Sequence, residues 1–125
     1  MNEGPFIVGP DVRIWGTIGT NKDVHVFGFI DGSVNGREVY VSPTAMVTGD
    51  IIATHVVVQG QVLGNIFADV LVLEASADVR GEIYHRELDL RAGAKFEGKS
   101  RRHDKPTTLA ATLSVYENAV ADDQT

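Results

Sequence analysis

The stretch Met46-Val-Thr-Gly-Asp-Ile51 contains a short motif that recurs along the chain and decides its fold. The motif is an apolar residue, any residue, glycine, any residue and a second apolar residue; it occurs six times, with serine ending the last copy. Its central glycines, spaced by 16, 17, 15, 17 and 17 residues, are Gly16, Gly32, Gly49, Gly64, Gly81 and Gly98. A near-constant period over most of a chain is the sequence signature of a repeat protein.

Apolar and polar residues alternate around each repeat glycine, and this period of two predicts short strands with one buried and one solvent-facing side. Two residues before the glycine lie Ile14, Ile30, Val47, Val62, Val79 and Phe96, and two after it lie Ile18, Val34, Ile51, Ile66, Ile83 and Ser100. A further apolar column is expected eight residues before the glycine, at Val8, Val24, Val41, Val56, Leu73 and Leu90. Mostly very small residues lie four before it, at Val12, Gly28, Ala45, Gly60, Ala77 and Ala94.

Every predicted strand has an equivalent at the same phase in the next repeat, which favours parallel stacking over an antiparallel meander. The sequence therefore predicts an all-β fold, a parallel β-solenoid of about six coils spaced roughly 4.8 Å apart, with small residues at a narrow corner. The two ends of such a rod are open sheet edges, which template polymerisation unless a helix or loop covers them. Seven residues precede Val8, so we expect no helix to cover that end.

The composition bounds the class of function. The chain has 125 residues, a net charge of −6 and a pI of about 5.0, so nucleic acid is not expected as the main partner. The absence of cysteine excludes disulfides and thiolate metal sites. No secretory signal and no long apolar window is found, which predicts a cytoplasmic protein.

The repeat stops after Ser100, where a charged segment leads to Pro106. The predicted organisation is an N-terminal tail over residues 1–5, a β-helix domain over 6–100 and a C-terminal tail over 101–125. The tail is expected to be disordered or a short amphipathic helix with Thr108 as its N-cap, docking on the last coil, a partner or a membrane. The apolar residues of that helix, spaced as on one helix face, are Leu109, Leu113, Tyr116 and Val120.

Longer stretches of the repeat region resemble the bactofilins, a family of bacterial cytoskeletal proteins. The resemblance is carried by Ile7-Val-Gly-Pro-Asp-Val-Arg-Ile-Trp-Gly-Thr-Ile18, Phe29-Ile-Asp-Gly-Ser-Val34, Val47-Thr-Gly-Asp-Ile51, Val56-Val-Val-Gln-Gly-Gln-Val-Leu-Gly-Asn-Ile66 and Ala92-Gly-Ala-Lys-Phe-Glu-Gly98. It implies a right-handed β-helix with a triangular core, whose subunits polymerise end to end, without nucleotide, into non-polar filaments. Such filaments act as scaffolds for cell-shape, cell-wall or polarity proteins.

The resemblance also implies where the protein works, which is the cytoplasm, including the inner face of the cytoplasmic membrane. Many family members carry a longer N-terminal tail with an apolar and basic membrane-targeting peptide. This chain has only Met1–Pro5 before Phe6. Membrane association is therefore expected to be indirect, through a client protein, and the main partner is expected to be a second copy of the chain.

The histidines of the repeat region do not predict a metal site. His25, His55 and His85 are spaced by 30 residues, which is not a multiple of the repeat, so they should fall on different sides of the coil. A zinc site needs several ligand atoms within about 2.1 Å of one ion. We expect all three to be solvated surface imidazoles.

No catalytic residue and no cofactor is predicted. Asp50, Glu82 and Glu97 are expected on a solvated surface, where stacked carboxylates repel each other and no apolar pocket raises a pKa. The chain has no phosphate-binding loop and no nucleophile elbow. A hexapeptide-repeat enzyme would need a strict period of six, which the observed spacing does not sustain.

Self-association should use the terminal coils, where apolar residues meet solvent. The residues expected to form the polymerisation interface are Phe6, Ile7, Val8, Ile14, Trp15, Leu88, Leu90 and Phe96. A charged residue at position 96 should abolish filaments and leave the solenoid folded. The alternatives are a β-solenoid that binds partners without polymerising and, less in keeping with the spacing, a hexapeptide-repeat-like enzyme.

Overall fold

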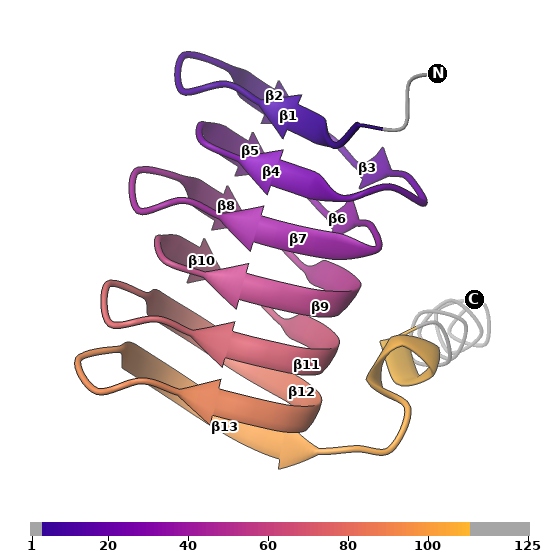
Figure 1. Ribbon diagram of the computed structural model, residues 1–125, viewed down its shortest axis with the longest axis vertical. Helices are drawn as coiled ribbons and strands as arrows, with labels where there is room; N and C mark the ends of the chain where they lie inside the picture. Colours follow the sequence, from indigo (N-terminus) through magenta and orange to yellow (C-terminus); the bar gives the residue numbers. More distant parts are fainter. Residues whose placement is uncertain (1–3, 111–125) are drawn as a thin grey trace, which may run out of the picture.

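The computed structural model describes residues 4–110 and confirms the parallel β-solenoid of about six turns (Figure 1). All strand pairs within these residues are parallel. The strands are β1 Phe6–Val8, β2 Arg13–Trp15, β3 Ile18–Gly19, β4 Val24–Val26, β5 Phe29–Asp31, β6 Val34–Asn35, β7 Glu38–Val41, β8 Met46–Thr48, β9 Ile51–Val58, β10 Gln61–Leu63, β11 Ile66–Leu73, β12 Asp78–Leu90 and β13 Lys95–Arg102.

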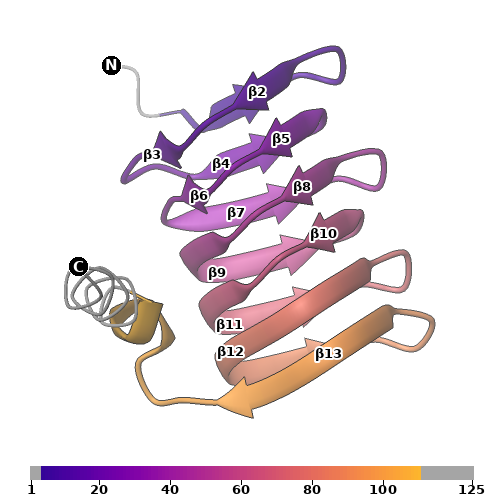
Figure 2. The same cartoon turned by 180° about the vertical axis from the view of Figure 1, so that it is seen from behind.

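Each coil has three sides, which we number in chain order. Side 1 contains β1, β4, β7 and the later parts of β9, β11 and β12; side 2 contains β2, β5, β8, β10 and the first parts of β12 and β13. Side 3 contains β3, β6, the first parts of β9 and β11, the middle of β12 and the end of β13. From Ile51 onward the chain bends from side 3 into side 1 without leaving the strand, so β9, β11 and β12 each turn a corner (Figures 1 and 2).

The core consists of ladders of inward residues, each stacked on its equivalent one coil away. Sides 2 and 3 carry the columns predicted from the repeat glycine, and Val47 and Ile51 in the middle of the rod are fully buried. Side 1 differs from the prediction in two coils. The register stacks Val8 on Val26 and Val41 on Val58, so the placement of Val24 and Val56 in that column was wrong.

The cause of this shift is the corner between sides 1 and 2, which differs in length from coil to coil. Four coils close it with a four-residue turn, as in the third coil, where the Ala45 N–H donates to the Ser42 carbonyl at 3.0 Å. The second and fourth coils are two residues shorter there. Their corners contain Gly28 and Gly60, where a Cβ would lie 2.3 and 2.2 Å from a carbonyl oxygen of the preceding coil.

The repeat glycines form a continuous ladder at the corner between sides 2 and 3. Each has a φ between +125° and +151°, a backbone conformation that side chains with a Cβ rarely adopt. From the second copy onward a Cβ would also lie within 2.0 Å of the carbonyl oxygen of the glycine one coil before, whereas Gly16 has no such neighbour. Glycine therefore recurs in the sequence once per coil because the same close backbone contact recurs in every coil after the first.

After β13 the chain reverses, and residues 106–110 form a helix that lies beside side 3 (Figures 1 and 2). The expectation that Thr108 caps this helix was wrong. The helix begins at Pro106, because proline suits the first turn, where its missing N–H is not needed. Of the predicted apolar stripe, Leu109 is half-buried, while Leu113, Tyr116 and Val120 lie outside the described residues. No helix within residues 4–110 is long and apolar enough to cross a membrane.

Candidate assembly surfaces at the two ends

The N-terminal end of the rod is the first coil, formed by β1, β2 and β3. Within the described residues each of these strands pairs on one edge alone, so the other edge presents free backbone groups. Large apolar side chains border this edge. Ile7 is 59% exposed and Trp15 is 68% exposed, and Phe6 is also exposed. This is an unusual amount of apolar surface to leave in water on one small coil.

The C-terminal end is the sixth coil, formed by the last four residues of β12 and by β13. Both pair on one edge alone among the described strands, with β11 and β12 respectively. Leu90 is 52% exposed, and Leu88 and Phe96 are partly buried against the core. Phe96 stacks on Val79 in the inward column of side 2, so its ring closes the end of that ladder.

The structure thus puts the predicted interface residues on the terminal coils, with unequal exposure. Val8 is only 1% exposed and Ile14 is half-buried, so the side chains of these two residues present little surface to a second molecule. Val12 was missed by the sequence prediction. It is exposed beside the first corner, and its apolar character among the small residues of that column was the available signal.

The core becomes polar as it approaches the C-terminal end. His85 follows Ala53 and Ala68 in an inward column of side 3, and its Nε2 lies 2.7 Å from the Ser100 hydroxyl. The interpretation of His85 as a solvated imidazole was therefore wrong, since its side chain is buried and its Nδ1 has no hydrogen-bond partner among the described residues. Burial, and secondarily the charge of Arg102, lowers the pKa of His85.

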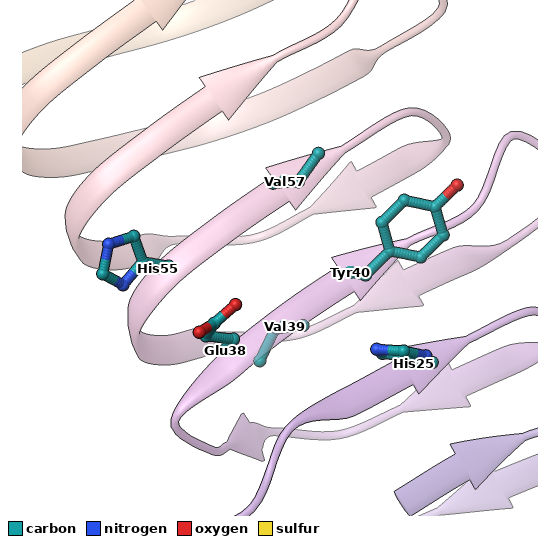
Figure 3. A pocket seen from close by; sticks show the side chains of 6 residues that line it. All are labelled: His25, Glu38, Val39, Tyr40, His55 and Val57. Carbon is teal, nitrogen blue, oxygen red and sulfur yellow. The ribbon is translucent and has the colours of Figure 1, made fainter. Parts of the chain in front are cut away.

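His25 and His55 line a shallow groove of about 260 Å³ on side 1 (Figure 3). His25 packs edge-on against Tyr40, with ring centroids 5.8 Å apart, and His55 lies next to Glu38 in the strand register. The close-up shows the two imidazoles at opposite ends of the groove. No group of three potential metal ligands occurs within residues 4–110.

The acidic residues weighed as a catalytic pair are held apart by the stacking of coils. Asp50 accepts a hydrogen bond from the backbone N–H of Asn65 at 3.1 Å, and the Asn65 side-chain oxygen accepts one from the backbone N–H of Glu82 at 3.1 Å. An amide thus separates the two carboxylates along the column. Glu97 belongs to another column, in which it follows Arg80. The hydrogen bonds of Asp50 and Asn65 thus link successive coils at this corner.

The comparisons with known proteins agree with this geometry. Residues 6–101 match the family model described as bactofilin, polymer-forming cytoskeletal. Bactofilin BacO of Myxococcus xanthus (strain DK1622) is 31% identical over 94 residues, which cover 74% of this chain and 75% of that protein. Bactofilin BacP of the same organism is 30% identical over 95 residues, which cover 74% of this chain and 40% of BacP. No solved structure gives a significant match. The chain belongs to the bactofilin family, which is a family of polymer-forming cytoskeletal proteins and not of enzymes.

Proposed function

We propose that this protein assembles end to end, without nucleotide, into cytoplasmic filaments that serve as a scaffold for cell-shape, cell-wall or polarity proteins. One observation carries the proposal. Within residues 4–110, the large apolar side chains that remain exposed are Phe6, Ile7, Val12, Trp15 and Leu90, all on the first or sixth coil. A contact between ends would remove this surface from water and pair the strand edges beside it.

The filaments proposed here are non-polar, so that like ends meet. Each contact is then isologous, with the same surface supplied by both subunits, and two different contacts alternate along the filament. One joins two first coils through residues such as Trp15, and the other joins two sixth coils through Leu90 and Phe96. The different chemistry of the two ends supports this arrangement, since the N-terminal end exposes Phe6, Ile7 and Trp15, whereas the C-terminal end exposes Leu90 and the polar Ser100.

The first test is negative-stain electron microscopy of the purified protein without nucleotide. The wild type should form filaments, and Phe96→Arg should not. Because Phe96 packs against the core, Leu90→Arg serves as a second variant at the same end, where the side chain is mostly in solvent. Gln61→Arg is the matched control, because Gln61 is exposed on side 2 in the middle of the rod. Circular dichroism should show the same β content in all four proteins.

The oligomeric state of the variants that cannot form filaments tests whether the filament is polar. In a non-polar filament, Leu90→Arg leaves the N-terminal contact intact and Trp15→Arg leaves the C-terminal contact intact, so each should give dimers in sedimentation velocity runs. In a polar filament either variant would give monomers. A wild type that stays monomeric or trimeric would contradict the proposal and leave a β-solenoid that binds partners without polymerising.

A further inference from the structure

Side 3 carries an apolar strip on its outer surface. The alternation of apolar and polar residues along a strand predicts polar residues at these outward positions. The outward column of this side runs Gly19, Asn35, Ile52, Phe67, Tyr84 and Arg101. Gly19, Asn35 and Arg101 are exposed, whereas the other three members are half-buried or buried, and Phe67 is only 5% exposed. We call Ile52, Phe67 and Tyr84 the side 3 strip.

The side 3 strip contains an aromatic pair. The rings of Phe67 and Tyr84 are stacked, with centroids 4.7 Å apart and planes within 3° of parallel. The Tyr84 hydroxyl lies 3.4 Å from a carboxylate oxygen of Glu82. Burial, reinforced by the charge of Glu82, raises the pKa of Tyr84. An aromatic ring that points away from the core of a solenoid can be buried to this degree only if something outside the coils covers it.

The segment of the chain after β13 lies on this side of the rod (Figures 1 and 2). After β13 it is turned back by a short polar loop, in which the His103 N–H donates to the His85 carbonyl at 2.8 Å and the Lys105 N–H donates to His103 Nδ1 at 3.0 Å. Arg102 and Asp104 form an ion pair at 3.1 Å across the same loop. The helix that follows lies beside side 3, next to the first parts of β9 and β11, in both views (Figures 1 and 2).

The helix has a buried face, as a helix that packs against the side 3 strip should have. Pro106 and Ala110, four residues apart on one helix face, are both buried, and Ala110 is 6% exposed. The adjoining face carries Leu109, and the sequence continues that spacing through Leu113, Tyr116 and Val120. The intervening residues are mostly small or polar, as the solvent-facing side of such a helix requires.

We propose that side 3 is a docking surface for an amphipathic helix and that its occupant is this chain's own segment 106–120. The docked segment covers the side 3 strip and keeps it from contacting other molecules along the flank of the rod. The surface lies on a flank and not on an end, so this inference does not rest on end-to-end assembly.

Hydrogen exchange followed by mass spectrometry on the full chain tests the proposal. Ala110→Glu should speed exchange in peptides spanning 104–120 by roughly ten- to hundredfold, because a carboxylate is costly to bury at this position and the helix must move away to solvate it. Thr108→Glu, which adds the same charge at an exposed position of the helix, should change exchange far less. Phe67→Asn should act like Ala110→Glu and leave exchange in the strands of sides 1 and 2 unchanged.

Three results would overturn the proposal. The first is a wild-type segment that already exchanges at the rate of an unstructured peptide, and the second is equal exchange in Ala110→Glu and Thr108→Glu. The third is protection of the segment that disappears on dilution, which would mean that a second copy supplies the helix. Electron micrographs of the same samples report on end-to-end assembly separately, because Ala110→Glu should still form filaments if that proposal holds.

Discussion

The glycine ladder predicts a graded response to alanine substitution, because three glycines differ in what a Cβ would meet. At Gly64 the Cβ would lie 2.0 Å from the Gly49 carbonyl oxygen, and the φ is +151°. At Gly16 the φ is +125° but no atom lies within 4 Å. At Gly19 the site is equally open and the φ is not in the positive range. The three sites therefore separate crowding from backbone strain.

The magnitudes follow from these two costs. Backbone strain of this kind costs about 1–3 kcal/mol, and overpacking against a neighbour that cannot move costs about 1–3 kcal/mol more. Gly64→Ala should thus lower the free energy of unfolding by roughly 2–6 kcal/mol and Gly16→Ala by roughly 1–3 kcal/mol. Gly19→Ala should be neutral or slightly stabilising, since alanine restricts the unfolded chain.

Guanidinium denaturation followed by circular dichroism, with all variants at one low protein concentration, measures the three values. The order Gly64→Ala, Gly16→Ala, Gly19→Ala is the expected result. Equal losses at Gly64 and Gly16 would show that the coils separate freely to admit a methyl group. The close backbone contact would then not be the reason for the glycine repeat.

Two further predictions concern the core. Because burial, and to a lesser extent Arg102, lowers the pKa of His85, the unfolded chain takes up the proton first. The contribution of His85 to the free energy of unfolding should be full above the ordinary histidine pKa of 6.5 and should decline as the pH falls from there through the lowered pKa of the folded state. Urea denaturation between about pH 5 and 8 should show this decline in the wild type and a flatter pH dependence in His85→Ala. Val47 is fully buried at mid-rod, so Val47→Ala should cost roughly 2–3 kcal/mol in the same assay, against much less for Val12→Ala at an exposed site.

The repeat glycine was enough to predict the fold class and the inward columns of sides 2 and 3. It failed on side 1, because counting back from the glycine at a fixed distance assumes corners of equal length, and the corners at Gly28 and Gly60 are shorter. The burial of His85 could have been predicted. It lies four residues after Gly81, as Ala53 and Ala68 lie after their glycines, and an even offset in a strand keeps the inward phase.

The covered flank was harder to predict from the sequence. Ile66, Phe67 and Ala68 are three apolar residues in a row, which breaks the alternation and signals a strand buried on both sides. The sequence does not say what lies against the outer side, because the proposed cover follows the turn after β13. A charged segment at this point could equally reverse the chain or lead it away from the solenoid. The hydrogen bonds of His103, which only the structure shows, fix the reversal.

The two proposals together explain why assembly would proceed in one dimension. A rod with apolar surface on its ends and on a flank would associate in both directions, giving sheets or irregular aggregates. Here the exposed large apolar residues among 4–110 are confined to the terminal coils, and the side 3 strip is buried or half-buried, as the proposed docking of the C-terminal segment requires. The net charge of −6 adds repulsion between flanks that lie side by side. Undocking of the C-terminal segment should therefore act on bundling of filaments and leave their length unchanged.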